Sequence, residues 1–266
     1  MIQTVNSSSY PEWPNLKVDY HKPIKLFMDK DLTGYDKDEE CFNILFTREP
    51  SALLGIVDYV NKNKDMFDAI LTYDENILKL PNSYFFPFGT SWVKEYDHKP
   101  KKFSVSHLTG FKLLLEGHGI RHQVNFNQDK INIPKAFFIS NRGRVTPNPF
   151  NNPEIGEKKE PLFDSEFCIC IENTKQNNFF TEKLIDCLVT KTVPIFYGAD
   201  NISDFFNTDG FIIANSTQEI IEKCNSLNES SYSKMIPAIQ DNYERSKKYS
   251  DIKPMLKETI ERAIND

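Results

Sequence analysis

The sequence has 266 residues, of which 39% are hydrophobic and 26% charged, as in an ordinary water-soluble globular protein with one large or two small domains. Its 38 acidic and 32 basic residues give a net charge of -6, which argues against a dedicated nucleic-acid-binding protein. No apolar run approaches the roughly 18–20 residues that span a bilayer, and residues 1–20 are polar and show no apolar run of the kind found in a secretory signal. We therefore expect a cytoplasmic protein with reduced cysteines.

The first hundred residues alternate short apolar runs with a helical pattern. Residues 1–20, with three consecutive serines and two prolines, predict an irregular arm. Four apolar runs that predict strands follow, at residues 24–28, 42–46, 67–71 and 84–88. A polar, acidic stretch over 29–40 predicts a loop, and apolar residues at helical spacing predict a helix over 53–60. Strands that alternate with helices indicate a parallel sheet covered on both faces.

A second block of the same kind begins near residue 101. Its predicted elements are a strand at 103–106, a helix from about 110 to 124, a strand at 136–139, a loop rich in proline and glycine over 141–159, and a strand, helix and strand at 167–171, 181–190 and 193–197. The last fifty residues predict helices, with Leu256, Ile260 and Ile264 on one face. The pattern indicates two α/β domains, residues 1–100 and 101–266. Ligands of such sheets bind beyond the carboxyl ends of the strands.

The segment 167–198 places polar side chains at such a strand end. Asn173 follows the predicted strand, and Thr181 has the side chain of a helix N-cap. Glu182 and Lys183 then occupy the first helical turn, where a glutamate suits the helix dipole and a lysine does not unless an anion shares the site. Two interpretations remain open from the residues alone. The pair binds a phosphate and ribose hydroxyls, or Glu182 complements the dipole and Lys183 is a solvated surface charge.

The same segment resembles the donor-site signature of glycosyltransferase family 10, the α-1,3/α-1,4-fucosyltransferases. The resemblance rests on Glu172-Asn173-Thr174, Phe180-Thr181-Glu182-Lys183-Leu184 and Val193-Pro194-Ile195-Phe196-Tyr197-Gly198, and it continues through Asp204-Phe205-Phe206 and Gly210-Phe211-Ile212. It implies a GT-B fold, in which two Rossmann-like domains face each other across a cleft. The C-terminal domain would bind GDP-fucose, and the N-terminal domain would carry the acceptor site.

The resemblance also implies roles for particular residues. Those expected to hold the GDP moiety are Asn173, Glu182 and Lys183. Phe179, which stands where a tyrosine is commoner, is the candidate aromatic contact to the nucleotide. Arg121, at the end of Gly117-His118-Gly119-Ile120-Arg121, is the best match to an arginine that meets the diphosphate, because a guanidinium pairs with two phosphate oxygens at once. Arg142 and Arg144 are its rivals.

Glu49 is the candidate catalytic base. Thr47-Arg48-Glu49-Pro50-Ser51 resembles a glutamate-containing turn after a strand, and that glutamate is the proposed base in some family members. The alternative is that Glu49 is only an exposed loop residue before a proline. Asp74 and Glu75 are the next carboxylates to consider.

The expected reaction is an inverting transfer of fucose to a hydroxyl of a glycan acceptor. Arg121, Lys183 and the helix N-terminus would stabilise the departing diphosphate, so we expect no cofactor and no obligatory metal ion. His118 and His122 are spaced for a shared helix face, but no third metal ligand accompanies them. With no membrane anchor in view, a soluble enzyme of bacterial or viral type is expected. The alternatives are a relative that uses another nucleotide sugar and a catalytically silent nucleotide-sugar-binding protein.

Overall fold

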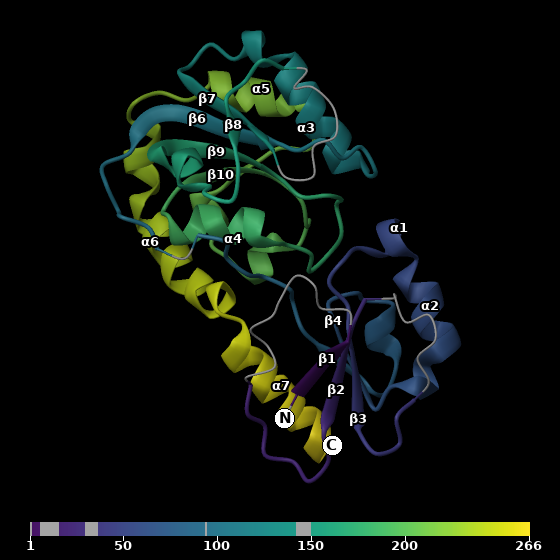
Figure 1. Cartoon of the computed structure of the whole chain (residues 1–266). Helices are drawn as coiled ribbons and strands as arrows, with labels where there is room; N and C mark the ends of the chain where they lie inside the picture. The colour runs from purple at the N-terminus through teal and green to yellow at the C-terminus, as the bar shows by residue number, and fades with distance from the viewer. Residues whose placement is uncertain (1, 6–15, 30–36, 94, 142–149) are drawn as a thin grey trace. The chain divides into compact units, whose positions relative to one another are not determined.

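A computed structural model describes residues 2–5, 16–29, 37–93, 95–141 and 150–266 (Figure 1). The chain divides into two compact units, which we call unit 1 (residues 1–88, 177–179 and 251–266) and unit 2 (residues 89–176 and 180–250). Each unit contains its own parallel sheet with helices, which confirms the predicted α/β class. The first boundary between the units lies between residues 88 and 89. The sequence pattern predicted this boundary between residues 100 and 101.

Unit 1 is built on a five-stranded parallel sheet of order β1-β2-β3-β4-β5. Its strands are β1 (Ile2–Val5), β2 (Ile24–Met28), β3 (Phe42–Phe46), β4 (Ala69–Thr72) and β5 (Ser83–Phe85). Its first two helices are α1 (Ser51–Leu54) and α2 (Ile56–Asn63). Side chains alternate across a strand, so Phe27, Leu45 and Ile70 share one face, where they pack with Ile56 and Val60 of α2.

The other face of this sheet is covered by α7 (Lys253–Asn265). Leu256 and Ile260 of α7 are buried in one core with Leu26 and Ile44 of the sheet. The apolar helix face predicted near the end of the chain is therefore present, but it completes unit 1. Periodicity indicates that a face is buried and gives no information about which sheet covers it.

The prediction of an irregular arm over residues 1–20 is wrong for residues 2–5, which form β1. This edge strand pairs in parallel with β2, with Ile2 opposite Ile24, and Ile2 is 1% exposed. Only four residues long, β1 depends on hydrogen bonds from β2 and on tertiary burial, neither of which a local pattern of residues contains.

Unit 2 is built on a six-stranded parallel sheet of order β11-β10-β9-β6-β7-β8. Its strands are β6 (Lys102–Thr109), β7 (Lys135–Ser140), β8 (Glu154–Ile155), β9 (Ser165–Ile171), β10 (Val193–Tyr197) and β11 (Ile212–Ile213). Its helices are α3 (Glu116–Phe126), α4 (Glu182–Val189), α5 (Thr217–Asn225) and α6 (Ser231–Ser250). Helices α3 and α5 pack on one face of the sheet, where Val105, Ile169 and Ile195 lie. All pairs are parallel, so the strands end at a common edge.

Among the described helices, none is long and apolar enough to cross a membrane.

Candidate functional site

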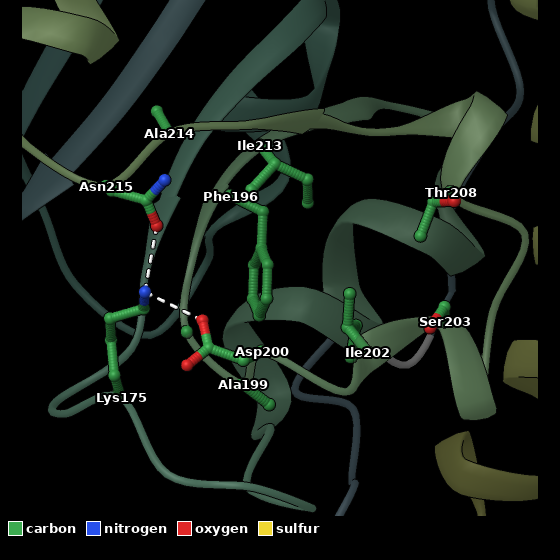
Figure 2. A pocket seen from close by; sticks show the side chains of 11 residues that line it. Lys175, Phe196, Ala199, Asp200, Ile202, Ser203, Thr208, Ile213, Ala214 and Asn215 are labelled. Carbon is green, nitrogen blue, oxygen red and sulfur yellow. Dashed lines mark hydrogen bonds and ion pairs between the residues drawn. The ribbon is translucent and has the colours of Figure 1, made fainter.

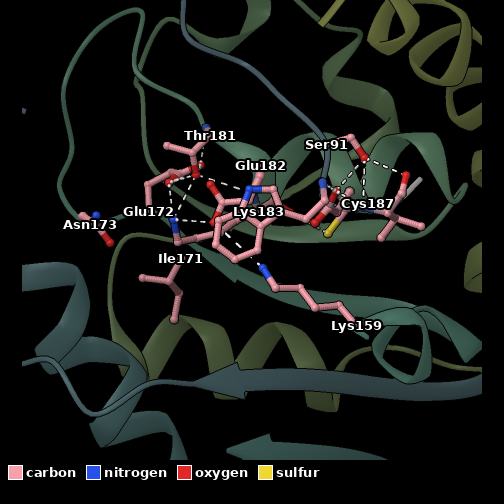
Figure 3. Close-up of polar contacts among 12 residues, drawn as sticks. Ser91, Lys159, Ile171, Glu172, Asn173, Thr181, Glu182, Lys183 and Cys187 are labelled. Carbon is pink, nitrogen blue, oxygen red and sulfur yellow. Dashed lines mark hydrogen bonds and ion pairs between the residues drawn. The ribbon is translucent and has the colours of Figure 1, made fainter. Parts of the chain in front are cut away.

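A buried carboxylate connects the end of β9 to the start of α4. Glu172 follows β9 and is fully buried. It accepts hydrogen bonds from the Thr181 backbone N–H at 2.7 Å and from Thr181 Oγ1 at 2.8 Å (Figure 3). Thr181 Oγ1 accepts from the Lys183 N–H, which confirms Thr181 as the N-cap of α4. The first turn of α4 is thus fixed to the strand edge by hydrogen bonds that are shielded from water.

Lys183 lies among negative charges of the protein itself. Its Nζ donates to Thr181 Oγ1 at 2.9 Å and lies 3.4 Å from Glu182 Oε1 and 3.5 Å from Glu172 Oε2. Burial acts to lower the pKa of Lys183, but the carboxylates of Glu182 and Glu172 outweigh it and raise that pKa. The ammonium is therefore not a freely solvated surface charge. Its unfavourable position in the helix dipole is compensated by these carboxylates.

Glu182 is an ionised acceptor at the same helix terminus. Burial by itself raises the pKa of its carboxyl, but the ammonium groups of Lys183 and Lys159 lower it to about 2. The Lys159 Nζ lies 3.9 Å from Glu182 Oε1, and the Glu182 side chain is 14% exposed. At neutral pH this carboxylate can only accept hydrogen bonds, which is the chemistry required to bind hydroxyl groups.

Helix α3 brings Arg121 and Asn173 together at the end of β9. A side chain at Gly117 would place its Cβ 1.8 Å from the Glu172 carbonyl oxygen, so glycine permits this close approach of α3. The Arg121 guanidinium is buried and donates to the Ile171 carbonyl at 3.0 Å through Nε and to Asn173 Oδ1 at 2.9 Å through Nη2. Arg121 therefore orients the Asn173 amide. Contact between Arg121 and a diphosphate stays a prediction.

Phe179 belongs to unit 1, is 1% exposed, and packs with its ring centroid 5.2 Å from that of Tyr73. A nucleotide could contact this ring only if the ring left its present packing, so its predicted role is untested. The rival arginines Arg142 and Arg144 lie outside the described residues.

Glu49 also belongs to unit 1 and follows β3 at its carboxyl end. The carboxylate of Asp29, which follows β2, accepts from the backbone N–H groups of Arg48 at 2.7 Å and of Glu49 at 3.1 Å. Asp29 also forms an ion pair with the Arg48 side chain at 2.8 Å. This turn is thus held by a buried carboxylate, and Glu49 itself is half-buried. The assignment of Glu49 as a base remains a prediction.

Three residues of the α4 site were missed by sequence reasoning, namely Trp92, Lys159 and Asp186. Asp186 lies one turn beyond Glu182, is buried, and accepts at Oδ1 from Ser91 Oγ and the Trp92 N–H, both at 2.8 Å. The Lys159 Nζ lies 3.8 Å from the centroid of the Trp92 ring. A carboxylate within the apolar stretch of α4 was a usable signal for Asp186. Nothing in the composition of the loop around Lys159 indicated its position.

Asp186 gives a prediction on stability. Burial raises the pKa of this carboxyl from 3.8 to about 6 in the folded protein. Between pH 3.8 and about pH 6, the Asp186 carboxyl is therefore more protonated in the folded state than in the unfolded state. The free energy of unfolding falls as pH rises through this range, by about 3 kcal/mol in total. An asparagine at this position would keep the Oδ1 acceptor and lose this titration. Urea unfolding of Asp186→Asn at about pH 4.5 and pH 7.5 should show the variant gaining stability relative to wild type at the higher pH. Parallel pH dependence in both proteins would contradict this.

A cavity of about 280 Å³ lies at the carboxyl ends of β10 and β11 (Figure 2). Lys175, in the loop after β9, forms an ion pair with Asp200 Oδ1 at 2.7 Å and donates a hydrogen bond to Asn215 Oδ1 at 2.8 Å. It thus connects the loops that follow β9, β10 and β11. Further residues that line the cavity are Phe196, Gly198, Ala199, Ile202, Ser203, Thr208, Ile213 and Ala214. The strand edge therefore offers a space with both apolar and hydrogen-bonding walls next to the loop that carries Asn173.

The two histidines of α3 make local contacts. His118 Nδ1 accepts from the Leu115 backbone N–H at 3.1 Å, and His122 Nε2 lies 2.9 Å from the Gly110 carbonyl. Within the part of the chain that the structure describes, no group of three or more His, Cys, Asp or Glu side chains could hold a metal ion.

The two units, each with a parallel sheet and helices, have the GT-B fold that solved glycosyltransferase structures share. A crystal structure of an α1,3-fucosyltransferase with GDP matches 91% of this chain and 78% of its own, with 16% identity and a TM-score of 0.53. The structure of TarM matches 92% of this chain and 55% of its own, with 13% identity and a TM-score of 0.57. At these identities the likeness concerns the fold.

Comparison of the sequence gives a more specific likeness. Residues 133–251, less than half of the chain, match the family model for the C-terminal part of glycosyltransferase family 10 (fucosyltransferase). The α-(1,3)-fucosyltransferase FucT of Helicobacter pylori is 34% identical over 58 residues, which are 22% of this chain and 12% of FucT. The family match contains Asn173, Glu182 and Lys183, whereas Arg121 and Glu49 lie before it.

Proposed function

We propose that this protein is an inverting glycosyltransferase that moves fucose from GDP-fucose to a hydroxyl group of a glycan acceptor. The observation that carries the proposal is the pair Glu182 and Lys183, held in the first turn of α4 by the buried Glu172. Glu182 supplies an ionised hydrogen-bond acceptor, Lys183 a cation, and Asn173 at the end of β9 an amide, all at the same edge of the sheet. The match of this same segment to the family model supports GDP-fucose as the donor.

On the donor side, each group has a chemical role. The Lys183 ammonium and the N-terminus of α4 would face the diphosphate, since both favour negative charge. The Glu182 carboxylate would accept hydrogen bonds from the ribose hydroxyls, and Asn173, oriented by Arg121, would contact the nucleotide. When the bond to fucose breaks, negative charge grows on the diphosphate, and groups already fixed in place stabilise it without reorganising. The proposed step uses no metal ion or cofactor.

On the acceptor side, Glu49 would act as the general base. Its carboxylate would take the proton of the acceptor hydroxyl while that oxygen attacks the anomeric carbon from the face opposite GDP. The carbon–oxygen bond to the diphosphate breaks as the new glycosidic bond forms, and GDP leaves with the electron pair. Asp29 supports this role because it fixes the backbone on which Glu49 lies.

Nucleotide selectivity tests the proposal most directly. GDP and GDP-fucose are expected to raise the melting temperature, and UDP and CMP are not. A ligand at about 100 times its Kd stabilises a protein by about 2.7 kcal/mol, which a melting curve resolves. Equal shifts with GDP and UDP would point to another nucleotide sugar. A shift with GDP but no transfer from GDP-fucose to any glycan in a broad acceptor screen would favour a silent nucleotide-sugar-binding protein.

A further inference from the structure

Lys159 occupies an unusual position for a loop lysine. It precedes the short 3-10 helix Glu160–Asp164, far in sequence from α4, yet its side chain is only 11% exposed. Its ammonium is 3.8 Å from the centroid of the Trp92 ring and 3.9 Å from Glu182 Oε1. Figure 3 shows Lys159 beside Glu182 at the start of α4. An aromatic face and a carboxylate both attract a cation, and a partly desolvated ammonium responds to them more strongly than one in water.

The ring that holds Lys159 is itself fixed to α4. The Trp92 backbone N–H and the Ser91 hydroxyl both donate to Asp186 Oδ1 at 2.8 Å, one turn along α4 from Glu182. Lys159 therefore contacts Glu182 directly, and it contacts Asp186 of the same helix indirectly, through Trp92. These contacts at two positions of α4 fix the Lys159 ammonium relative to the first turn of the helix.

We propose that Lys159 is a positioning residue of the donor site, which holds the Glu182 carboxylate in its binding orientation and leaves Lys183 available for the diphosphate. The inference rests on the proposed function. Lys183 forms ion pairs with two carboxylates, Glu172 at 3.5 Å and Glu182 at 3.4 Å. Without Lys159, it would be the one lysine in the described part of the chain that pairs with either of them. Lys159 adds a second positive charge next to Glu182. Lys183 can then bind a phosphate while Glu182 keeps a second cation beside it.

The other charged groups near Glu182 do not supply this effect. Arg121 is buried at the end of β9 and donates to Ile171 and Asn173. Asp186 repels the carboxylate of Glu182, as the contribution of Glu182 to the raised pKa of Asp186 indicates. Besides Lys183, Lys159 is the cation among these neighbours that forms an ion pair with Glu182.

A double-mutant cycle on GDP binding tests the proposal. GDP is titrated calorimetrically into wild type, Lys159→Met, Glu182→Gln and the double variant, with Lys159→Arg as the rescue and Lys158→Met as the matched control. Lys158 is exposed and adjacent in sequence, so its loss gives the same change of net charge. We expect Lys159→Met to weaken GDP binding by about 3- to 10-fold. Lys159→Arg should restore most of the affinity, and Lys158→Met should bind like wild type.

The decisive result is the dependence on Glu182. If Lys159 acts through this carboxylate, Lys159→Met should change affinity by less than about 2-fold in the Glu182→Gln background. An equal loss in both backgrounds, or no loss in the wild-type background, would overturn the proposal while the proposed function stands. Absence of GDP binding by wild type would instead overturn the proposed function, and this inference with it. Should Lys159→Met fail to fold, Trp92→Leu, which removes the ring beneath the ammonium, must show the same dependence.

Discussion

Replacing Lys183 with alanine is expected to weaken GDP binding by about 10- to 150-fold, the range that corresponds to one charge-assisted hydrogen bond of about 1.5–3 kcal/mol. The ammonium is fixed at the N-terminus of α4, where a bound phosphate would meet both the side chain and the helix dipole. Calorimetric titration of GDP into wild type and variant measures the effect. Lys223→Ala, at an exposed lysine on α5, is the matched control and should change the binding free energy by less than about 0.5 kcal/mol.

The same substitution should also lower the free energy of unfolding, because it leaves the buried Glu172 and the neighbouring Glu182 without their cation. Binding must therefore be measured well below the melting temperature of the variant. A variant that is less stable but binds GDP with wild-type affinity would show that Lys183 serves only these two carboxylates. Loss of affinity beyond the loss of stability indicates a direct contact with the nucleotide.

Much of unit 2 could be predicted from its sequence because the relevant signals are local. The apolar run that forms β9, the N-cap Thr181 and the amphipathic α4 follow one another within about thirty residues, so short-range patterns determine them. The structure agrees with these predictions to within a residue or two. Unit 1 contains the two larger errors, the missed strand β1 and the placement of α7. Both elements depend on partners distant in sequence, which periodicity does not identify.

In the candidate site, too, the residues close together in sequence could be predicted, and those brought in from distant segments could not. Asn173, Glu182 and Lys183 could be named from the sequence because the segment that carries the family resemblance is continuous and folds as one strand, one loop and one helix start. Lys159 and Trp92 could not, since only the three-dimensional path of two separate loops places them beside α4. No local pattern indicated that Lys183 would be paired with Glu172 and Glu182. An anion at the helix N-terminus was expected, and the protein supplies two carboxylates beside that lysine.

Glu49→Gln should separate transfer from binding. Removal of a general base is expected to lower turnover by about 10²–10⁴-fold, and glutamine keeps the shape of the side chain. The backbone N–H of residue 49 would still donate to Asp29, so the local turn should be preserved. GDP affinity should be unchanged, because in the proposed mechanism Glu49 contacts the acceptor hydroxyl, whereas Asn173, Glu182 and Lys183 contact GDP.

The measurement compares initial rates of GDP release with GDP-fucose and an acceptor identified by the glycan screen. Asp74→Asn and Glu75→Gln are the controls, since these carboxylates follow β4, the strand next to β3. Wild-type turnover in Glu49→Gln, with a large loss in either control, would move the role of base to that residue. We expect Glu49→Gln to lose turnover while its GDP affinity is unchanged, and Lys183→Ala to bind GDP more weakly. This pair of results would indicate that acceptor activation and donor binding reside in different units of the chain.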